Sequence, residues 1–235
     1  AEALATAGAS LVLLARRVPE LERTGTRLRQ DYGVEVHEIA ADLSDRTAVQ
    51  TAFEGIVSER GPIDILVNNA GTAPTGAADK QWPEDWDRTL ELNLSAVFHC
   101  SLLAARSMRD SGRGGRIINI ASIFGHLGSS LFRVSSYAAS KGGLENLTRQ
   151  LAVEWAADGI TVNAICPGYV DTPIHADYAV SKPFMVSSEK AARIIVNGLE
   201  RGKSTITFPW QIGLVMGLLR LLPSWLYRGV ARLLA

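Results

Sequence analysis

Short apolar runs alternate with amphipathic segments along most of the chain. Six runs have the length and apolar character of buried strands: Leu11–Leu14, Val34–Ile39, Ile63–Val67, Arg116–Ile120, Thr161–Ile165 and Thr205–Phe208. Five segments between or after them show helical patterns: Pro19–Asp31, Arg46–Glu59, Glu84–Met108, Ser136–Ala157 and Ser188–Leu199. Apolar strands separated by helices are typical of a parallel sheet that is covered on both faces. The pattern therefore predicts a single α/β domain over residues 1–209, doubly wound around one Rossmann-type parallel sheet. Gly33 should end the first of these helices, and Ser44 should cap the second.

Composition narrows the classes of function. The 235 residues carry a formal net charge of zero without a basic block, which argues against nucleic acid as a partner. Cys100 and Cys166 lie far apart in the sequence, so we expect no disulfide framework and a location in the reducing cytoplasm. No metal site is expected either, because the histidines form no i, i+4 pair; they are His37, His99, His126 and His175.

Polar or glycine-containing sequences follow four of the predicted strands. These are Asp42, Asn68–Gly71, Ser122 and Pro167–Gly168. Doubly wound sheets bind ligands at the carboxyl ends of their strands, so these residues are predicted to meet at one ligand-binding edge.

Two stretches of the chain read Tyr-x-x-x-Lys. Tyr137 and Lys141 lie at i and i+4 near the start of a long amphipathic helix, whose apolar stripe comprises Leu144, Leu147, Leu151 and Trp155. Tyr178 and Lys182 repeat the letters, but Pro183 follows directly and disfavours helical geometry there. We interpret Tyr137 as the functional tyrosine and Tyr178 as part of a loop or pocket wall.

The first pair suits acid–base chemistry. Free tyrosine titrates near pH 10, and a cation within about 6 Å favours its phenolate form, which Lys141 would supply. Ser122 can donate a hydrogen bond to a substrate oxygen, although without Tyr137 it would be an ordinary turn serine. Asn93 lies in an apolar helical run and needs buried partners, either as a structural cap or as part of a proton relay.

Together these residues resemble the short-chain dehydrogenase/reductase family, from the first residue to about Arg201. The motifs that match are Asn68-Asn69-Ala70-Gly71, Asn93, Ser122, Tyr137-x-x-x-Lys141 and Pro167-Gly168-Tyr169-Val170-Asp171-Thr172. The segment Tyr137–Thr172 is similar to the branch of the family that contains 3-oxoacyl-carrier-protein reductases and sugar-acid dehydrogenases. The resemblance implies the strand order 3-2-1-4-5-6-7, a small carbonyl or alcohol substrate, and a homo-dimer or homo-tetramer formed through the helices Glu84–Met108 and Ser136–Ala157.

The resemblance also assigns roles. Tyr137 would be the general acid/base, Ser122 the donor to the substrate oxygen, Lys141 the partner of Tyr137 and of a ribose hydroxyl, and Asn93 the relay. Asp42 would bind adenine, and Val170 and Thr172 the carboxamide. The full set of implied cofactor contacts beside the catalytic residues is Asp42, Leu43, Asn69, Ala70, Gly71, Pro167, Gly168, Val170 and Thr172.

The preference between nicotinamide cofactors depends on the residues after the strand Leu11–Leu14. Sites that prefer NAD usually carry an acidic residue there, whereas this chain reads Ala15-Arg16-Arg17. Two guanidinium groups suit a 2′-phosphate, so Arg16 and Arg17 predict NADP, with NAD as the alternative. The competing interpretation is that both arginines are solvated charges at the start of a helix.

The chain departs from the family pattern at both ends. The family's first strand and its glycine-rich phosphate loop are not found, because Ala5–Ser10 precedes the strand that leads to Arg16. We therefore expect these residues to come from a longer chain, and a form starting at Ala1 to bind cofactor poorly.

At the other end, residues 210–235 form a Leu-rich tail that is too interrupted to span a membrane. It would pack on its own domain or a partner subunit, or lie on a membrane surface. The alternative function is accordingly a nucleotide-binding scaffold that acts through this tail. The loop Ile174–Ser187 would line a mostly apolar substrate pocket.

Overall fold

The computed structural model describes residues 1–126, 133–171, 184–200, 206–211 and 214. Its elements in chain order are α1 (Glu2–Thr6), β1 (Leu11–Ala15), α2 (Val18–Tyr32), β2 (Val36–Ala40), α3 (Arg46–Arg60), β3 (Ile65–Asn68), η1 (Ala78–Lys80), α4 (Pro83–Leu90), η2 (Glu91–Ser95), α5 (Ala96–Asp110), β4 (Gly115–Ile120), η3 (Ile123–Gly125), α6 (Ser135–Glu154), η4 (Ala156–Asp158), β5 (Ile160–Pro167), α7 (Ser188–Glu200) and β6 (Thr207–Phe208). The six strands and five main helical segments predicted from the sequence are all present, which confirms the α/β class.

The strands are parallel throughout, and they form two hydrogen-bonded groups rather than one continuous sheet. β1 pairs with β2, and β3, β4, β5 and β6 pair in that order. Side chains on β3 remain partly open to solvent, with Ile65 and Val67 about 40% exposed. The interruption between β1 and β3 falls where the expected strand order places the family's first strand.

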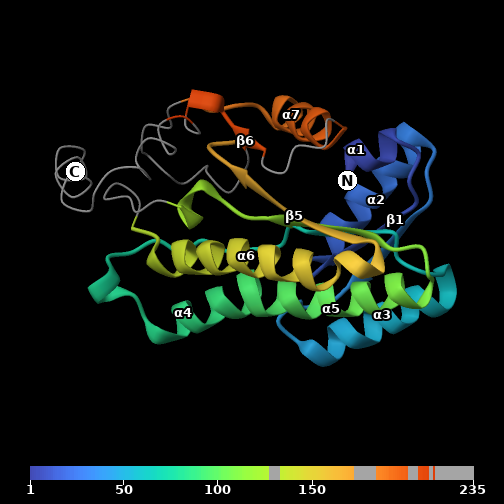
Figure 1. Ribbon diagram of the computed structural model, residues 1–235, viewed down its shortest axis with the longest axis horizontal. Helices are drawn as coiled ribbons and strands as arrows, with labels where there is room; N and C mark the ends of the chain where they lie inside the picture. Colours follow the sequence, from blue (N-terminus) through green and yellow to red (C-terminus); the bar gives the residue numbers. More distant parts are fainter. Residues whose placement is uncertain (127–132, 172–183, 201–205, 212–213, 215–235) are drawn as a thin grey trace.

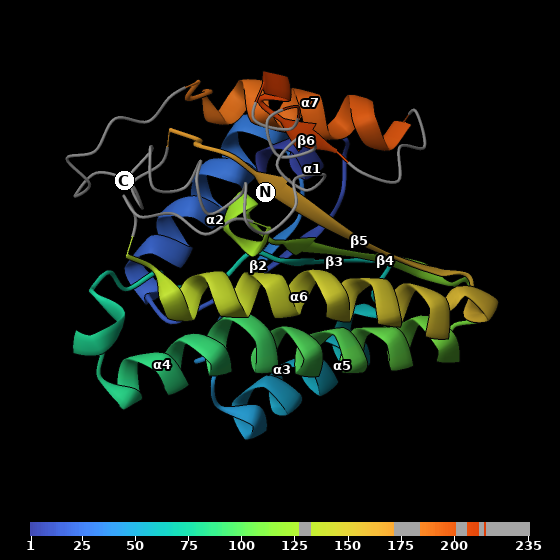
Figure 2. The same ribbon diagram turned by 60° about the vertical axis from the view of Figure 1, so that its left-hand side comes forward.

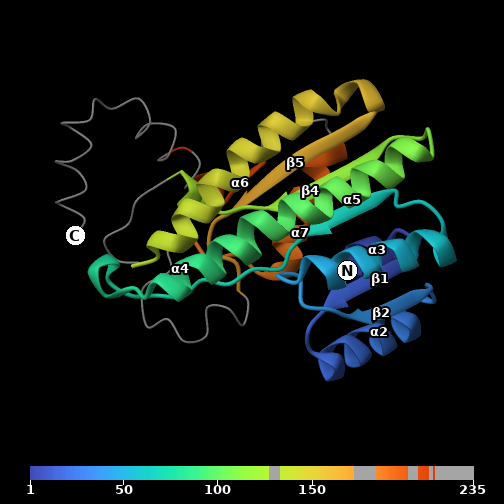
Figure 3. The ribbon, with the colours of Figure 1, turned by 90° about the horizontal axis from the view of Figure 1, so that it is seen from below.

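Helices cover the strands on both faces, as Figures 1 and 2 show. α1, α2 and α7 lie on one face, and α3, α5 and α6 lie on the other, where α5 and α6 run side by side (Figure 3). The largest apolar core lies under the second set of helices. It includes Val49 and Phe53 of α3, Met108 of α5, Ile117 of β4 and Leu151 of α6.

The helix predicted over Glu84–Met108 is not regular. It begins as α4, passes through the single π-helical turn η2, and continues as α5. Asn93 is the buried residue of that turn. A π-helical turn inserts one residue into the helix and is often found at functional sites.

Of the two predicted caps, one is confirmed and one is wrong. Gly33 ends α2 in the left-handed conformation, with φ of 66°. The cap of α3 is Asp45 rather than Ser44, because a carboxylate oxygen of Asp45 accepts hydrogen bonds from the backbone N–H groups of Thr47 and Ala48, at 2.9 and 3.1 Å.

Most of the predicted tail lies outside the described residues, as do Thr172, Tyr178 and most of the loop Ile174–Ser187. Within the described ranges, no helix has both the length and the apolar character needed to cross a bilayer.

Candidate active site

The carboxyl ends of β3, β4 and β5 form one edge, as the sequence predicts. Asn68 at the end of β3 is in register with Asn119 of β4, and Asn119 is in register with Ala164 of β5. The segments that follow these strands therefore start next to one another. They contain Asn69–Gly71, Ser122 and Gly168.

Tyr137 and Lys141 lie in the first two turns of α6, on one face of the helix. The Lys141 ammonium is 5.5 Å from the centre of the Tyr137 ring, so the predicted adjacency of phenol and cation is confirmed. Lys141 is buried, and its Nζ donates a hydrogen bond of 2.6 Å to the carbonyl oxygen of Ile120 at the end of β4. Burial lowers the pKa of Lys141 to about 8, against a weaker opposing effect from Cys166.

Ser122 follows β4 and lies at the start of η3. It is buried and caps η3, with its hydroxyl oxygen accepting a hydrogen bond from the backbone N–H of Phe124 at 3.3 Å. The Phe124 ring packs edge-on against the Tyr137 ring, with 6.4 Å between ring centres. Tyr137 is partly buried. Its ring contacts Lys141, which is bonded to the end of β4, and Phe124 of η3.

Asn93 uses its amide to join three segments. Its oxygen accepts a hydrogen bond from the backbone N–H of Thr72 at 2.9 Å, and its nitrogen donates to the carbonyl of Thr72 at 2.9 Å and to the Ser140 hydroxyl at 3.1 Å. Asn93 therefore has the hydrogen-bonding partners that a buried asparagine needs. It ties the loop after β3 to α6, one residue before Lys141.

Gly71 lies against this amide. A Cβ atom at position 71 would stand 3.1 Å from the Asn93 oxygen and 3.8 Å from the Lys141 ammonium. A side chain at position 71 would therefore press on the Asn93 amide, which would have to shift by a few tenths of an ångström.

A buried hydrogen-bond network, which was not predicted from the sequence, joins the carboxyl ends of β3 and β4 to α5 and α6. Asn68 donates to Asn119 at 2.9 Å and to Ser101 of α5 at 3.1 Å, while Asn119 donates to Thr148 of α6 at 2.9 Å. All four residues are buried. The signal was available, because an asparagine inside an apolar strand has to find a hydrogen-bonding partner.

The residues predicted to bind the adenosine side of the cofactor are exposed, unlike the buried residues around Tyr137. Arg16, Arg17 and Asp42 are exposed at the ends of β1 and β2. Arg16 is 3.8 Å from the Asp42 carboxylate, and Arg17 is 3.0 Å from Glu20. The other oxygen of Asp42 accepts a hydrogen bond of 2.9 Å from the backbone N–H of Ser44.

Four other residues predicted to contact the cofactor are partly buried and pack within the domain: Leu43, Pro167, Gly168 and Val170. Leu43 is partly buried and packs against the apolar core. Gly168 donates its backbone N–H to the carbonyl of Phe208 at 2.9 Å, and Pro167 is in register with Phe208. Val170 is partly buried and pairs with Val186.

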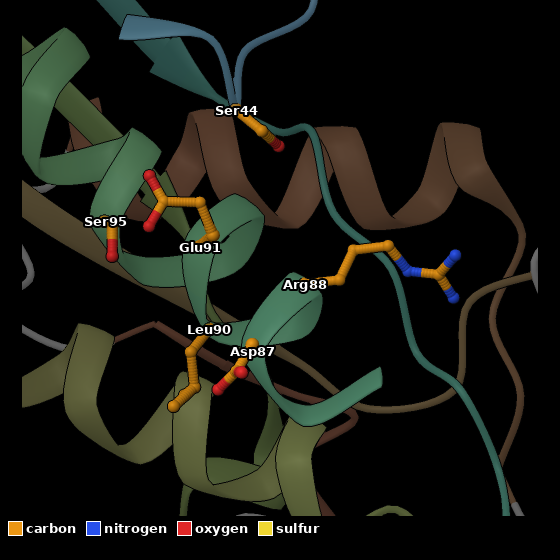
Figure 4. A pocket seen from close by; sticks show the side chains of 6 residues that line it. All are labelled: Ser44, Asp87, Arg88, Leu90, Glu91 and Ser95. Carbon is orange, nitrogen blue, oxygen red and sulfur yellow. The ribbon is translucent and has the colours of Figure 1, made fainter. Parts of the chain in front are cut away.

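A pocket of about 510 Å³ lies between the segment after β2 and the helical turns α4 and η2 (Figure 4). Ser44 lines one side, and residues of α4 and η2 line the other: Asp87, Arg88, Leu90, Glu91 and Ser95. Its lining includes neither Tyr137 nor Ser122, so the two candidate residues lie outside this pocket.

Comparison with known proteins points to one family. The sequence model for short chain dehydrogenases matches residues 1–182. The chain is 44% identical to a 2-dehydro-3-deoxy-D-gluconate 5-dehydrogenase of Dickeya dadantii (strain 3937) over 134 residues, which are 57% of this chain and 52% of that relative. The match thus spans about half the length of that relative. A cis-4-hydroxycyclohexanecarboxylate dehydrogenase of Sinomonas cyclohexanicum is 37% identical over 202 residues, covering 86% of this chain and 78% of the relative.

Solved structures agree with these relatives. A short-chain dehydrogenase from Sphingobium yanoikuyae, in complex with NADPH, superposes with a TM-score of 0.79 at 29% identity. The superposition covers 95% of this chain and 90% of that one.

Proposed function

The chain belongs to the short-chain dehydrogenase family, and we propose that it is an NADP-preferring oxidoreductase that interconverts a carbonyl compound and an alcohol. The observation that carries the proposal is the position of the Lys141 ammonium, 5.5 Å from the Tyr137 ring and at the same strand end as Ser122. A nucleotide-binding scaffold has no need of these groups in one place, so their assembly favours an enzyme over that alternative.

Two side chains are proposed to act on the substrate oxygen, one as a proton donor and one as a hydrogen-bond donor. In the reductive direction, Tyr137 donates its phenolic proton to that oxygen, and Ser122 donates a hydrogen bond to it. The positive charge of Lys141 favours the phenolate that remains. When bound next to Tyr137 and Lys141, NADPH would supply the hydride for the carbonyl carbon. We propose that Asn93 fixes the loop after β3 to α6 through its hydrogen bonds to Thr72 and Ser140. We also propose that Asn93 takes part in a proton relay.

The residues at the strand edge also suit a dinucleotide. Gly71 lies close to Lys141, and a Cβ atom there would make a tight contact of 3.1 Å with the Asn93 oxygen. Arg16 and Arg17 stand exposed at the end of β1, where guanidinium groups would bind a 2′-phosphate and no acidic residue follows the strand. NADPH in the similar structure from Sphingobium yanoikuyae supports the same choice.

We further propose a homo-oligomer built on α4, α5 and α6. Apolar side chains are exposed on these helices, namely Trp86, Phe98 and Val153. Exposed aromatic and aliphatic groups on neighbouring helices are typical of subunit contacts. Two unpaired, buried cysteines, Cys100 and Cys166, support the cytoplasm as the location, since that compartment keeps thiols reduced.

The experiment is an assay of NADPH oxidation over a panel of ketones and aldehydes, repeated with NADH. We expect at least one carbonyl compound to be reduced, with a kcat/KM for NADPH at least about tenfold above that for NADH. Binding of NADPH without oxidation by any member of the panel would favour the scaffold. A better kcat/KM with NADH would overturn the cofactor preference alone.

A further inference from the structure

A second cluster of reactive side chains lies behind the candidate active site. In the described part of the chain, His126, Glu145 and Cys166 bring one ligand atom each to within 4.8 Å of one another. They come from three separate elements: the end of η3, the middle of α6 and the end of β5. None of the roles proposed above uses them.

The contacts inside the cluster are close. His126 Nδ1 is 2.9 Å from one carboxylate oxygen of Glu145, and the Cys166 thiol is 3.5 Å from the other. In a tetrahedral zinc site the same kinds of ligand atom stand about 3.3–3.6 Å apart. Zinc bound to His126 Nδ1 and to the Glu145 oxygen next to it would move these two atoms apart by a few tenths of an ångström. The Cys166 thiol lies next to the other oxygen, so the thiol or the carboxylate would also turn to meet the ion.

The Glu145 carboxylate is held in place by its contacts with His126, Cys166 and Arg149. Glu145 and Cys166 are buried, and the space around the Glu145 carboxylate is kept open by Gly125, where a Cβ atom would stand 2.4 Å from it. The nearby cation is Arg149, 3.5 Å from Glu145 and mostly exposed. The side chain of His126 is 16% exposed, which gives an ion a way in from solvent.

We propose that His126, Glu145 and Cys166 form a zinc-binding site. Imidazole nitrogen, carboxylate oxygen and thiolate sulfur are all zinc ligands, and three such ligands leave a fourth position for water. On binding, the zinc ion forms bonds to His126 Nδ1, to a Glu145 oxygen and to the Cys166 sulfur. The thiol proton is released to solvent, and the remaining imidazole proton resides on Nε2.

Histidine spacing did not reveal this site. The sequence analysis expected no metal because no two histidines are four residues apart, and that test detects only ligands on one helix. Here the fold, and not the sequence spacing, brings the three ligands together.

Cobalt provides the most direct test, because a thiolate bound to Co²⁺ gives a charge-transfer band in the near ultraviolet. The full chain without a histidine tag, freed of metal by a chelator, would be titrated with Co²⁺ and then with Zn²⁺. We expect one Co²⁺ per chain with the thiolate band, and loss of the band as Zn²⁺ displaces it. Absence of the band in the wild-type protein would overturn the proposal.

Variants separate this site from adventitious binding. Cys166→Ser should lose the band, whereas Cys100→Ser, which removes the other buried thiol, should keep it. Glu145→Gln and His126→Gln should each weaken Zn²⁺ binding at least about tenfold. If Cys166→Ser does not fold, the partly exposed His126→Gln decides alone. Unchanged zinc affinity in His126→Gln, or loss of the band in Cys100→Ser, would contradict the assignment. None of these readouts depends on dehydrogenase activity, so a failed activity assay leaves the zinc proposal standing, and the reverse also holds.

Discussion

The two ends of the candidate site are built in opposite ways. Around Tyr137, the supporting groups Asn93, Ser122 and Lys141 are buried and form hydrogen bonds of 2.6–3.3 Å within the protein. At the end of β1, the side chains of Arg16 and Arg17 are 66% and 77% exposed and form only surface ion pairs. The residues proposed for the chemistry are thus fixed by folding, while the arginines proposed to select the cofactor are exposed.

This difference has an energetic meaning. A buried and oriented dipole needs no reorganisation when charge develops on the substrate, so it acts strongly there. An exposed guanidinium is hydrated and screened, and its ion pairs contribute about 0–1 kcal/mol each. Substitutions at the buried end should therefore have larger effects than substitutions at the exposed end, and the predictions that follow test this order.

The largest effect is expected at Ser122. Ser122→Ala removes the donor to the substrate oxygen and should lower kcat about 10²–10³-fold, because a fixed donor to a developing oxyanion stabilises the transition state by about 3–4 kcal/mol. The measurement is steady-state kinetics with saturating NADPH. Ser135→Ala, on the exposed start of α6, is the matched control and should keep near wild-type kcat. A loss below tenfold in Ser122→Ala would remove this serine from the proposed chemistry.

A second effect concerns the charge of Lys141. Burial lowers its pKa from 10.5 to about 8, so between these values the unfolded chain binds more protons than the folded one. The cost of burying the charge is present in full below pH 8 and disappears as the pH rises through 10.5. Denaturant unfolding of Lys141→Met, which has no charge to bury, gives the reference.

The difference in free energy of unfolding between Lys141→Met and wild type is expected to change with pH. Below pH 8, Lys141→Met should have a higher free energy of unfolding relative to wild type than it has at high pH. This advantage should fall by about 3 kcal/mol as the pH rises from 8 to 10.5. A difference that does not vary with pH would show that Lys141 is not buried as a charge.

The amide network should contribute less. Asn119→Ala removes the acceptor for Asn68 and the donor to Thr148, leaving buried polar groups short of partners. We expect a loss of about 2 kcal/mol in the free energy of unfolding. Asn163→Ala on β5, which is only partly buried, is the comparison and should cost clearly less. Equal losses in the two variants would mean that the network adds nothing beyond strand packing.

The smallest effect belongs to the exposed end. Replacing both Arg16 and Arg17 by Gln should raise the KM for NADPH about tenfold, a change of about 1.4 kcal/mol, and leave the KM for NADH almost unaffected. High salt should reduce the difference, since exposed charges are screened. Arg23→Gln, further along α2, controls for a general change in charge. Equal changes for both cofactors would show that the two arginines are only solvated charges.

The sequence predicted those features that local pattern determines. Parallel strands are apolar on both faces, so all six could be located, and the i, i+4 spacing placed Lys141 next to Tyr137. The cap of α3 was misplaced by one residue because Ser44 and Asp45 are both good caps. Only the backbone geometry decides between them.

Other features depend on contacts between distant segments. The π-helical turn at Asn93 has no local signature, and the partners of Asn93 lie 21 and 47 residues away in the sequence. The same holds for the network of Asn119 and for the cluster around Glu145. Apolar periodicity records which face is buried, but it does not record which buried polar groups will meet.

The central claim is that Tyr137 next to Lys141 is the acid/base. The most direct measurement compares kcat of Tyr137→Phe and Tyr178→Phe at saturating NADPH, with NADPH affinity determined for each. Tyr137→Phe should lose at least about 10²-fold in kcat and still bind NADPH, whereas Tyr178→Phe should stay within about tenfold of wild type. If Tyr137→Phe keeps more than about a tenth of wild-type kcat, or if the large loss falls on Tyr178→Phe instead, the account is wrong.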